Sequence, residues 1–294
     1  MDSVVILIAA PGSRAISEAL AKTLGELTAA KPEWLCTEEA LQFSVSAATF
    51  PGLAADLQRL ALDLPVDIAL VPAVNRRKRL LIADMDSTMI GQECIDELGA
   101  LAGVGERIKE ITARAMRGEL DFEAALKARL ALMKDLPETA IAKVLRERIT
   151  FTPGGRTLIA TMKAHGAYAA LVSGGFTQFT SYVARELGFD EDRANELLIA
   201  GGRLTGGVRE PILGQDAKVS ALEDITAKLG IAPADALAVG DGANDIPMLR
   251  RAGLGVALHA KPKVQEQVPV RINHGDLSAL LYLQGYRRDE FHTS

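Results

Sequence analysis

The stretch "LLIADMDSTMIGQE", residues 80–93, decides the fold class of this chain. A short apolar run ends abruptly at Asp84, and a second carboxylate, Asp86, follows two positions later. Side chains two apart in an extended chain point to the same face, so both acids can address one ligand. A lone Asp-X-Asp is normally a solvated strand end, so its meaning depends on the rest of the chain.

Three further apolar runs end in the same abrupt way: "AALVSGG" (169–175), "ALAVGDGAND" (236–245) and "GLGVALHA" (253–260). Between the first two of these lie a helical pattern at about 177–187, a Gly-rich hairpin-like stretch at 197–213 and a helical pattern at about 217–229. Strands that alternate with helices predict an α/β fold with a doubly wound parallel sheet. Because ligands bind at the carboxyl edge of such a sheet, Asp84, Ser173 and Asp241 should meet there.

The segments outside this alternation predict two additions to the core. Residues 1–75 show a β-α-β-α-β order, with a short strand near Trp34–Cys36, which predicts a small α+β ferredoxin-like domain. Its element order resembles the amino-acid-sensing ACT domains, although a packing or dimerising role is an equal alternative. Residues 76–294 form the second predicted domain, with a helical cap inserted at about 91–150. The basic run "NRRKR" at 75–79 is expected to be a solvated linker.

Composition narrows the class of protein. The 294 residues carry a net charge of −5, which gives no overall electrostatic footprint for nucleic acid or an anionic membrane. The apolar run at 3–10 is too short to span a bilayer. Two distant cysteines, Cys36 and Cys94, are expected to be reduced thiols of a cytoplasmic protein. The four histidines show no zinc-ligand spacing.

The acids at the strand ends suggest a reaction. Asp84 and Asp241, with Asp245 nearby, form a hard oxygen cluster of the kind that Mg²⁺ prefers. Asp84 can attack phosphorus as a nucleophile while Asp86 donates a proton to the leaving oxygen. Asp86 can then take a proton from the hydrolytic water.

Four motifs in order carry a family resemblance. "DMDST" resembles the first motif of the haloacid dehalogenase superfamily of phosphatases, and "VSGG" its second, with Ser173 and the amides of Gly174 and Gly175 on phosphoryl oxygens. Lys218 in "GQDAKVSAL" fits the third motif, and "GDGANDIPML" fits the fourth, with Asp241 and Asp245 at the metal. The resemblance implies a Rossmann-like core.

Longer stretches narrow the resemblance to the phosphoserine phosphatase family. They include "DMDSTMIGQECIDELG", "AMRGELDFEAALKARLALMKDLP" and "LVSGGFTQF", and the likeness covers nearly all of 80–285. It implies O-phospho-L-serine as substrate, Mg²⁺ as cofactor and a step in serine biosynthesis, and it leaves a homodimer open. Residue by residue, it implies catalytic Asp84 and Asp86, a metal held by Asp84, Asp241, Asp245 and the Asp86 carbonyl, and substrate contacts from Glu93, Met116, Phe122, Arg129, Ser173, Gly174, Gly175, Lys218 and Asn244.

The segment that contains Arg129 has the pattern of an amphipathic helix. Asp121 is a suitable N-cap for a helix whose apolar stripe is Phe122, Leu126, Leu130 and Met133. Arg129 lies seven residues after Phe122, about 20° round the same inward face. On an isolated helix it would snorkel to solvent, but with a carboxylate-bearing substrate its planar fork becomes an anion clamp.

Two alternatives stay open beside phosphoserine hydrolysis. A related site could transfer the phosphoryl group to an alcohol acceptor such as homoserine. The chain could also be an amino-acid sensor with a vestigial catalytic domain, although the intact acids, lysine and glycines speak against this.

Overall fold

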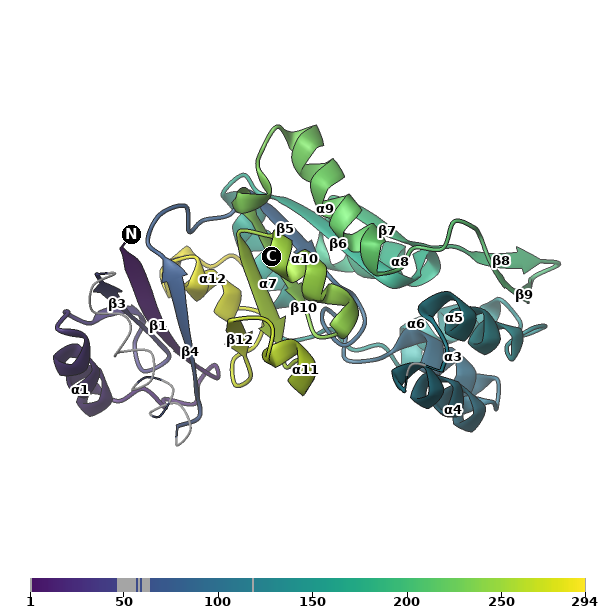
Figure 1. Cartoon of the computed structure of the whole chain (residues 1–294), viewed down its shortest axis with the longest axis horizontal. Helices are drawn as coiled ribbons and strands as arrows, with labels where there is room; N and C mark the ends of the chain where they lie inside the picture. The colour runs from purple at the N-terminus through teal and green to yellow at the C-terminus, as the bar shows by residue number, and fades with distance from the viewer. Residues whose placement is uncertain (1, 47–56, 58, 60–63, 118, 294) are drawn as a thin grey trace.

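The computed structural model describes residues 2–46, 57, 59, 64–117 and 119–293. The molecule is elongated, with an N-terminal sheet at one end, a central α/β core and a group of helices at the other end (Figure 1). Within the described residues, no helix combines the length and the apolar character needed to cross a membrane.

The central sheet confirms the predicted doubly wound core. Its six strands run in the order β12-β11-β10-β5-β6-β7, and every neighbouring pair is parallel. The strands are β5 (Leu80–Ala83), β6 (Tyr168–Phe176), β7 (Glu191–Asn195), β10 (Ala236–Gly240), β11 (Leu254–Leu258) and β12 (Val270–Ile272). The two edge strands, β7 and β12, were not predicted, because one is polar and the other is only three residues long.

Helices cover both faces of this sheet, so successive residues of β5 point into two different apolar cores. Leu81 and Ala83 belong to one cluster, and Leu80 and Ile82 to the other. The helices are α7 (Gly155–Ala164), α8 (Thr177–Leu187), α9 (Gln215–Leu229), α10 (Ile246–Arg251), α11 (Pro262–Gln265) and α12 (Ala279–Leu283), with short 3₁₀ turns η1 (Pro233–Asp235), η2 (Ala243–Asp245) and η3 (Arg288–Glu290). Both helices predicted between 169 and 240 are confirmed, and α9 begins two residues early.

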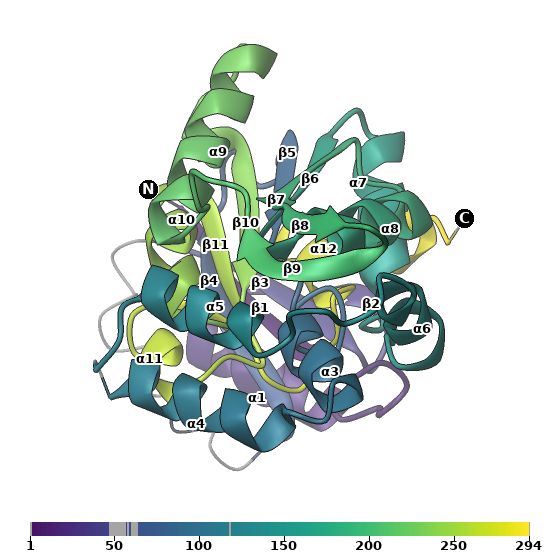
Figure 2. The same cartoon turned by 90° about the vertical axis from the view of Figure 1, so that its right-hand side faces the viewer.

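A helical group, which we call the cap, follows β5. It contains α3 (Cys94–Leu101), α4 (Gly105–Met116), α5 (Phe122–Ala131) and α6 (Thr139–Glu147). The two chain segments that join it to the core pair with each other at Ile90 and Phe151. The predicted hairpin, β8 (Leu197–Ala200) and β9 (Arg203–Val208), projects from the core alongside α5 (Figures 1 and 2). The Asp121 N-cap is confirmed, because its carboxylate accepts the Ala124 amide at 2.7 Å.

The N-terminal segment forms an antiparallel sheet, as the ferredoxin-like prediction requires. Its order is β2-β3-β1-β4, with β1 (Ser3–Ala9), α1 (Glu18–Thr28), β2 (Glu33–Cys36), β3 (Ala40–Val45) and β4 (Val66–Pro72). The second helix predicted here, at 52–64, falls largely outside the described residues. The likeness to ACT domains and the boundary at residue 75 stay predictions.

One face of this small sheet packs against the core. Val4, Ile6 and Ile8 of β1 share a hydrophobic cluster with Leu280 and Tyr282 of α12. The expectation that residues 75–79 are a solvated linker is therefore wrong in part. Arg76 donates hydrogen bonds to the Gln42 side chain and to the Tyr282 and Leu283 carbonyls. Lys78 is buried, and its ammonium donates to the Ala234 carbonyl. Both residues lie where the small sheet meets the core.

Candidate active site

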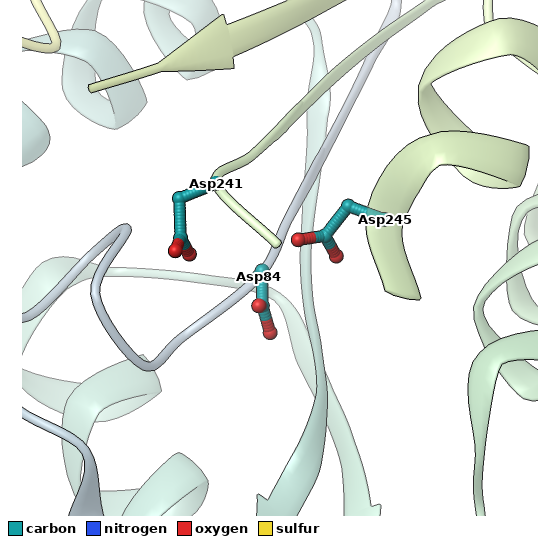
Figure 3. Close-up of side chains that lie close together, drawn as sticks. All are labelled: Asp84, Asp241 and Asp245. Carbon is teal, nitrogen blue, oxygen red and sulfur yellow. The ribbon is translucent and has the colours of Figure 1, made fainter. Parts of the chain in front are cut away.

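The carboxyl edge of the parallel sheet brings together the polar residues that follow its strands, as predicted. Asp84 directly follows β5, Asp241 directly follows β10, and Ser173 lies in the last part of β6. Asp245 joins them from η2, where its carboxylate accepts the Gly242 amide at 2.9 Å. Ligand atoms of Asp84, Asp241 and Asp245 all lie within 4.8 Å of one another (Figure 3).

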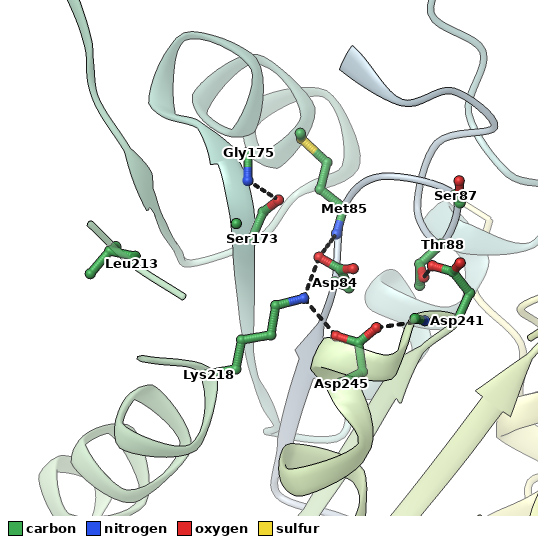
Figure 4. A network of polar contacts seen from close by, with 12 residues as sticks. Asp84, Met85, Ser87, Thr88, Ser173, Gly175, Leu213, Lys218, Asp241 and Asp245 are labelled. Atoms are coloured by element: carbon green, nitrogen blue, oxygen red, sulfur yellow. Dashed lines mark hydrogen bonds and ion pairs between the residues drawn. The ribbon is translucent and has the colours of Figure 1, made fainter. Parts of the chain in front are cut away.

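Lys218 is the cation of this cluster. Its ammonium lies 2.7 Å from Asp84 Oδ1 and 2.5 Å from Asp245 Oδ1, and its side chain is buried (Figure 4). Asp84 Oδ1 also accepts the Met85 amide at 2.8 Å. Thr88, which the sequence did not single out, donates its buried hydroxyl to Asp241 Oδ1 at 3.1 Å. Each carboxylate is therefore held in a fixed orientation.

The pKa values of these groups are shifted by burial and by crowded negative charge. Burial and the neighbouring Asp245 raise the pKa of Asp84 well above its ordinary value, against the opposing effect of Lys218. Burial and Asp245 likewise raise the pKa of Asp241 to about 6. Burial alone would lower the pKa of Lys218, but Asp84 and Asp245 raise it, so Lys218 stays charged. Lys218 is the buried ammonium at these three buried carboxylates, and Lys261 is exposed and 3.9 Å from Asp241. The cluster therefore keeps an excess of negative charge that a divalent cation would neutralise.

Asp86 and Glu93 lie on the cap side of the cluster. Asp86 Oδ1 accepts the Cys94 amide at 3.3 Å, and burial, followed by the charge of Glu93, raises the pKa of Asp86 to about 7. Glu93 occupies the N-cap position of α3. Its side chain makes no capping bond there, and it instead accepts the Ser87 hydroxyl at 2.9 Å and lines the cavity described below.

The "SGG" motif forms an irregular end of β6 that faces the acids, which we call the "SGG" turn. The Gly175 amide donates to Ser173 Oγ at 2.9 Å, so an anion would have to share or replace that bond. A Cβ added at Gly175 would lie 3.0 Å from Asp86 Oδ2, and one at Gly174 would lie 3.3 Å from the Phe122 ring. Glycines are needed here because the acid and the cap both approach the backbone closely.

A cavity of about 520 Å³ lies between this edge and the cap. It is lined by most of the predicted site residues: Asp84, Asp86, Glu93, Phe122, Arg129, Ser173, Gly174, Gly175, Asp241 and Asn244. Lys218 and Asp245 lie buried just behind it. Met116 ends α4, but its side chain lies outside the described parts of the chain.

The predicted inward stripe of α5 is only partly right. Leu126, Leu130 and Met133 are buried, but Phe122 is 39% exposed, and α5 ends at Ala131 before Met133. The Phe122 ring lies against Gly174 and Gly214 of the core and lines the cavity. Arg129 does face the cavity, and burial lowers the pKa of its guanidinium while the charges of Asp96 and Glu93 oppose that change.

Sequence reasoning missed three residues of the cavity wall or its support. Thr112 lines the cavity from α4, and its buried hydroxyl has no hydrogen-bond partner among the described residues. Lys261 lines it from the core side, with its ammonium 3.9 Å from Asp241 Oδ2. Asn195 lies behind the "SGG" turn and bonds the Gly174 carbonyl. Thr112 carries no strand-end or motif signal. Lys261 directly follows the apolar run 253–260, so the same strand-end rule that placed Asp84 and Asp241 could have found it. Asn195 lies in a polar strand that was itself not predicted.

Comparison with known proteins agrees with this geometry. The sequence profile of the haloacid dehalogenase-like hydrolases matches residues 81–250. A solved structure of a HAD family hydrolase from Salmonella enterica serovar Typhi superposes with a TM-score of 0.85 at 32% identity, covering 96% of this chain and 98% of that one. Fold and site thus define a haloacid dehalogenase-like hydrolase.

Two relatives narrow the class. A phosphoserine phosphatase of Streptococcus thermophilus is 46% identical over 200 residues, which cover 68% of this chain and 93% of that protein. A phosphoserine phosphatase of Streptomyces coelicolor is 45% identical over 253 residues, covering 85% of this chain but only 62% of that protein's length. The chain belongs to the phosphoserine phosphatase family.

Proposed function

We propose that this chain hydrolyses O-phospho-L-serine to L-serine and phosphate. One observation carries the proposal: a single cavity joins the acidic cluster at Asp84 to a cap wall that bears a half-buried arginine, Arg129, together with a carboxylate, Glu93. The first part suits a phosphoryl group. The second offers a cation and an anion, which are the partners that the carboxylate and the ammonium of an amino acid need.

Mg²⁺ fits the donor set. Asp84, Asp241 and Asp245 offer oxygen ligands close together, and the raised pKa values of Asp84 and Asp241, caused by burial and by Asp245, mark negative charge in need of a partner. We assign these side chains and the Asp86 carbonyl as its ligands. When bound, the ion would neutralise charge on the phosphoryl oxygens and orient them.

The chemistry is assigned to two aspartates. An oxygen of Asp84 attacks phosphorus as the ester P–O bond breaks, and protonated Asp86 gives its proton to the departing serine oxygen. Water then attacks phosphorus and gives its proton to Asp86 as the Asp84–phosphorus bond breaks. Phosphate leaves, and both acids return to their starting states. Burial and Glu93 raise the pKa of Asp86 to about 7, which suits a group that must give and take a proton near neutral pH.

The remaining residues bind the substrate in this proposal. Ser173, the Gly174 and Gly175 amides and Lys218 stabilise phosphoryl charge, and Asn244 contacts the phosphoryl group from η2. Glu93 takes the ammonium and Arg129 the carboxylate, while Phe122 and Met116 enclose the carbon chain. The cap keeps bulk water out while the first step takes place.

Phosphate release tests the function directly. The wild-type chain should release phosphate from phosphoserine faster than from phosphothreonine or sugar phosphates, and only with Mg²⁺ present. No release from phosphoserine would support the alternative of a sensor with a vestigial site. A phosphorylated alcohol formed when homoserine is added would support phosphoryl transfer instead.

Arg129→Ala tests the specificity. It should lower kcat/KM for phosphoserine several-fold to a few hundred-fold, the effect of about 1–3 kcal/mol for a charge-assisted contact. p-Nitrophenyl phosphate, which has no carboxylate, should be affected much less, and Arg129→Lys should restore only part of the loss. Arg146→Ala is the matched control, since Arg146 lies exposed on the cap and, among the residues that the structure describes, pairs with its neighbour Glu147 alone, at 3.2 Å. Equal losses on both substrates would mean that Arg129 supports the cap and binds no carboxylate.

A further inference from the structure

The "SGG" turn is a bulge within strand β6. Strands β6 and β7 pair in register up to Val172 and Arg193, but the next pair is Phe176 with Asn195. Two extra residues on β6 therefore bulge out of the ladder, and the bulge contains Ser173, Gly174 and Gly175. Such a bulge frees backbone amides to face the cavity, but it also removes the neighbouring strand as a partner for the carbonyls.

Asn195 replaces the missing partner. Its side-chain amide donates to the Gly174 carbonyl at 2.9 Å and to the Leu213 carbonyl at 3.2 Å. Its Oδ1 accepts the Leu213 amide at 2.7 Å. Asn195 is 2% exposed, so it is a buried amide that uses both donor hydrogens and one acceptor site on backbone groups.

Packing alone does not fix the turn. A second cavity, of about 140 Å³, is lined by Val172 and Ser173 on one side and by Leu213, Gly214 and Lys218 on another. Part of the surface beside the turn thus faces empty space rather than side chains. The bonds of Asn195 tie Gly174 to the segment at Leu213, which lines this second cavity.

We propose that Asn195 is a positioning residue that holds the Gly174 peptide, and with it the amides of residues 174 and 175, in the orientation that receives the phosphoryl group. The inference rests on the proposed function only in assigning this turn to phosphate. Asn195 is buried behind the turn and is not among the residues that line the cavity. It acts through Gly174 on every phosphate ester alike, whatever the alcohol.

The test compares two substrates and one inhibitor. Asn195→Asp keeps the side-chain volume and the acceptor for Leu213, but it sets carboxylate oxygen against the Gly174 carbonyl. Asn195→Ala removes all three bonds. Both should lower kcat/KM for phosphoserine and for p-nitrophenyl phosphate by the same factor, about 10–100-fold, because misplaced groups of this kind cost that much. The inhibition constant of inorganic phosphate should rise in parallel.

Gln284→Met is the matched control for a merely structural effect. Gln284 is also a buried amide, which accepts the Lys78 amide at 2.9 Å and donates to the Leu280 carbonyl at 3.1 Å, but it lies at the junction with the N-terminal sheet. This variant should lower the unfolding temperature and leave kcat/KM and phosphate inhibition unchanged at room temperature.

Two outcomes would overturn the inference. One is an Asn195 variant that is less stable but has wild-type kcat/KM and phosphate inhibition. The other is a loss confined to phosphoserine, which would place Asn195 in recognition of the amino acid. If the wild type cleaves p-nitrophenyl phosphate but not phosphoserine, the proposed substrate is wrong, and the role of Asn195 can still be measured on the first ester. Should Asn195→Ala fail to fold, the isosteric Asn195→Asp decides.

Discussion

Asp67→Asn should destabilise the chain without affecting catalysis. Asp67, near the start of β4, is 5% exposed and accepts three consecutive backbone amides of the core: Asn273 at 2.7 Å, His274 at 3.0 Å and Gly275 at 2.8 Å. Asparagine removes the charge from all three bonds and turns an NH₂ group toward at least one amide. Losing charge assistance on three bonds and leaving one donor unpaired costs about 3–5 kcal/mol.

Thermal unfolding and activity together test this reasoning. For a chain of this size, that loss corresponds to a fall in unfolding temperature of about 6–10 °C. Glu38→Gln is the control, because Glu38 belongs to the same sheet domain but forms an exposed pair with Arg14 at 3.5 Å, and it should change stability by less than about 1 kcal/mol. At room temperature kcat/KM should be unchanged, since β11 lies between β12 and the strands β10 and β5 that carry Asp241 and Asp84. An unfolding temperature for Asp67→Asn equal to that of wild type would refute the view that this carboxylate joins the sheet to the core.

Three further predictions concern the site and the N-terminal sheet. Asp84→Asn should abolish turnover, because an amide is a poor nucleophile, and a phosphoenzyme trapped on another residue would contradict the assignment. Mg²⁺ should raise the unfolding temperature of the wild type. Asp241→Asn should raise the unfolding temperature in the absence of metal, because it removes a carboxylate whose pKa is elevated by burial and Asp245, but this variant should gain no further stability from Mg²⁺. Calorimetry with Mg²⁺ or with chelator measures both effects. A chain beginning at Asn75 should aggregate on expression, because its core would expose the surface that covers Val4, Ile6 and Ile8, and a soluble, active product would show instead that the two domains are independent.

The convergence of Asp84, Ser173 and Asp241 was predictable because it follows from topology alone. Once apolar runs alternate with helices, the parallel sheet and its single carboxyl edge follow, and the residues after each run must meet. Arg129 needed one more step, the helical period from Phe122. The same period placed Phe122 correctly at the cavity, but it could not show that the ring stays 39% exposed and lies over Gly174 of the core.

What could not be predicted depends on contacts between segments that are distant in sequence. Asp67 and Asn273 are separated by 206 positions, and the role of Arg76 appears only when the small sheet meets α12. A charged run such as 75–79 has the same composition in a solvated linker and in a polar interface. Strand β7 could not be predicted because its sequence, "EDRAN", lacks apolar alternation. Polar side chains are possible in this strand because it lies at the edge of the sheet and is only partly buried.

The β8–β9 hairpin connects the two halves of the cavity. Near its tip, Leu204 exchanges backbone bonds with the cap at Asp135 and Leu136, both at 2.9 Å, and Gly202 accepts the Glu138 amide at 2.9 Å. At its base, β8 begins just after Asn195, and the chain returns from β9 to Leu213, the residue that Asn195 holds beside Gly174. The cap therefore cannot swing away from the sheet edge without breaking these bonds or carrying the hairpin with it. The base of that hairpin is also hydrogen-bonded, through Asn195, to the "SGG" turn. The β8–β9 hairpin therefore positions both the cap wall that is proposed to bind the amino-acid part of the substrate and the turn that is proposed to bind its phosphate.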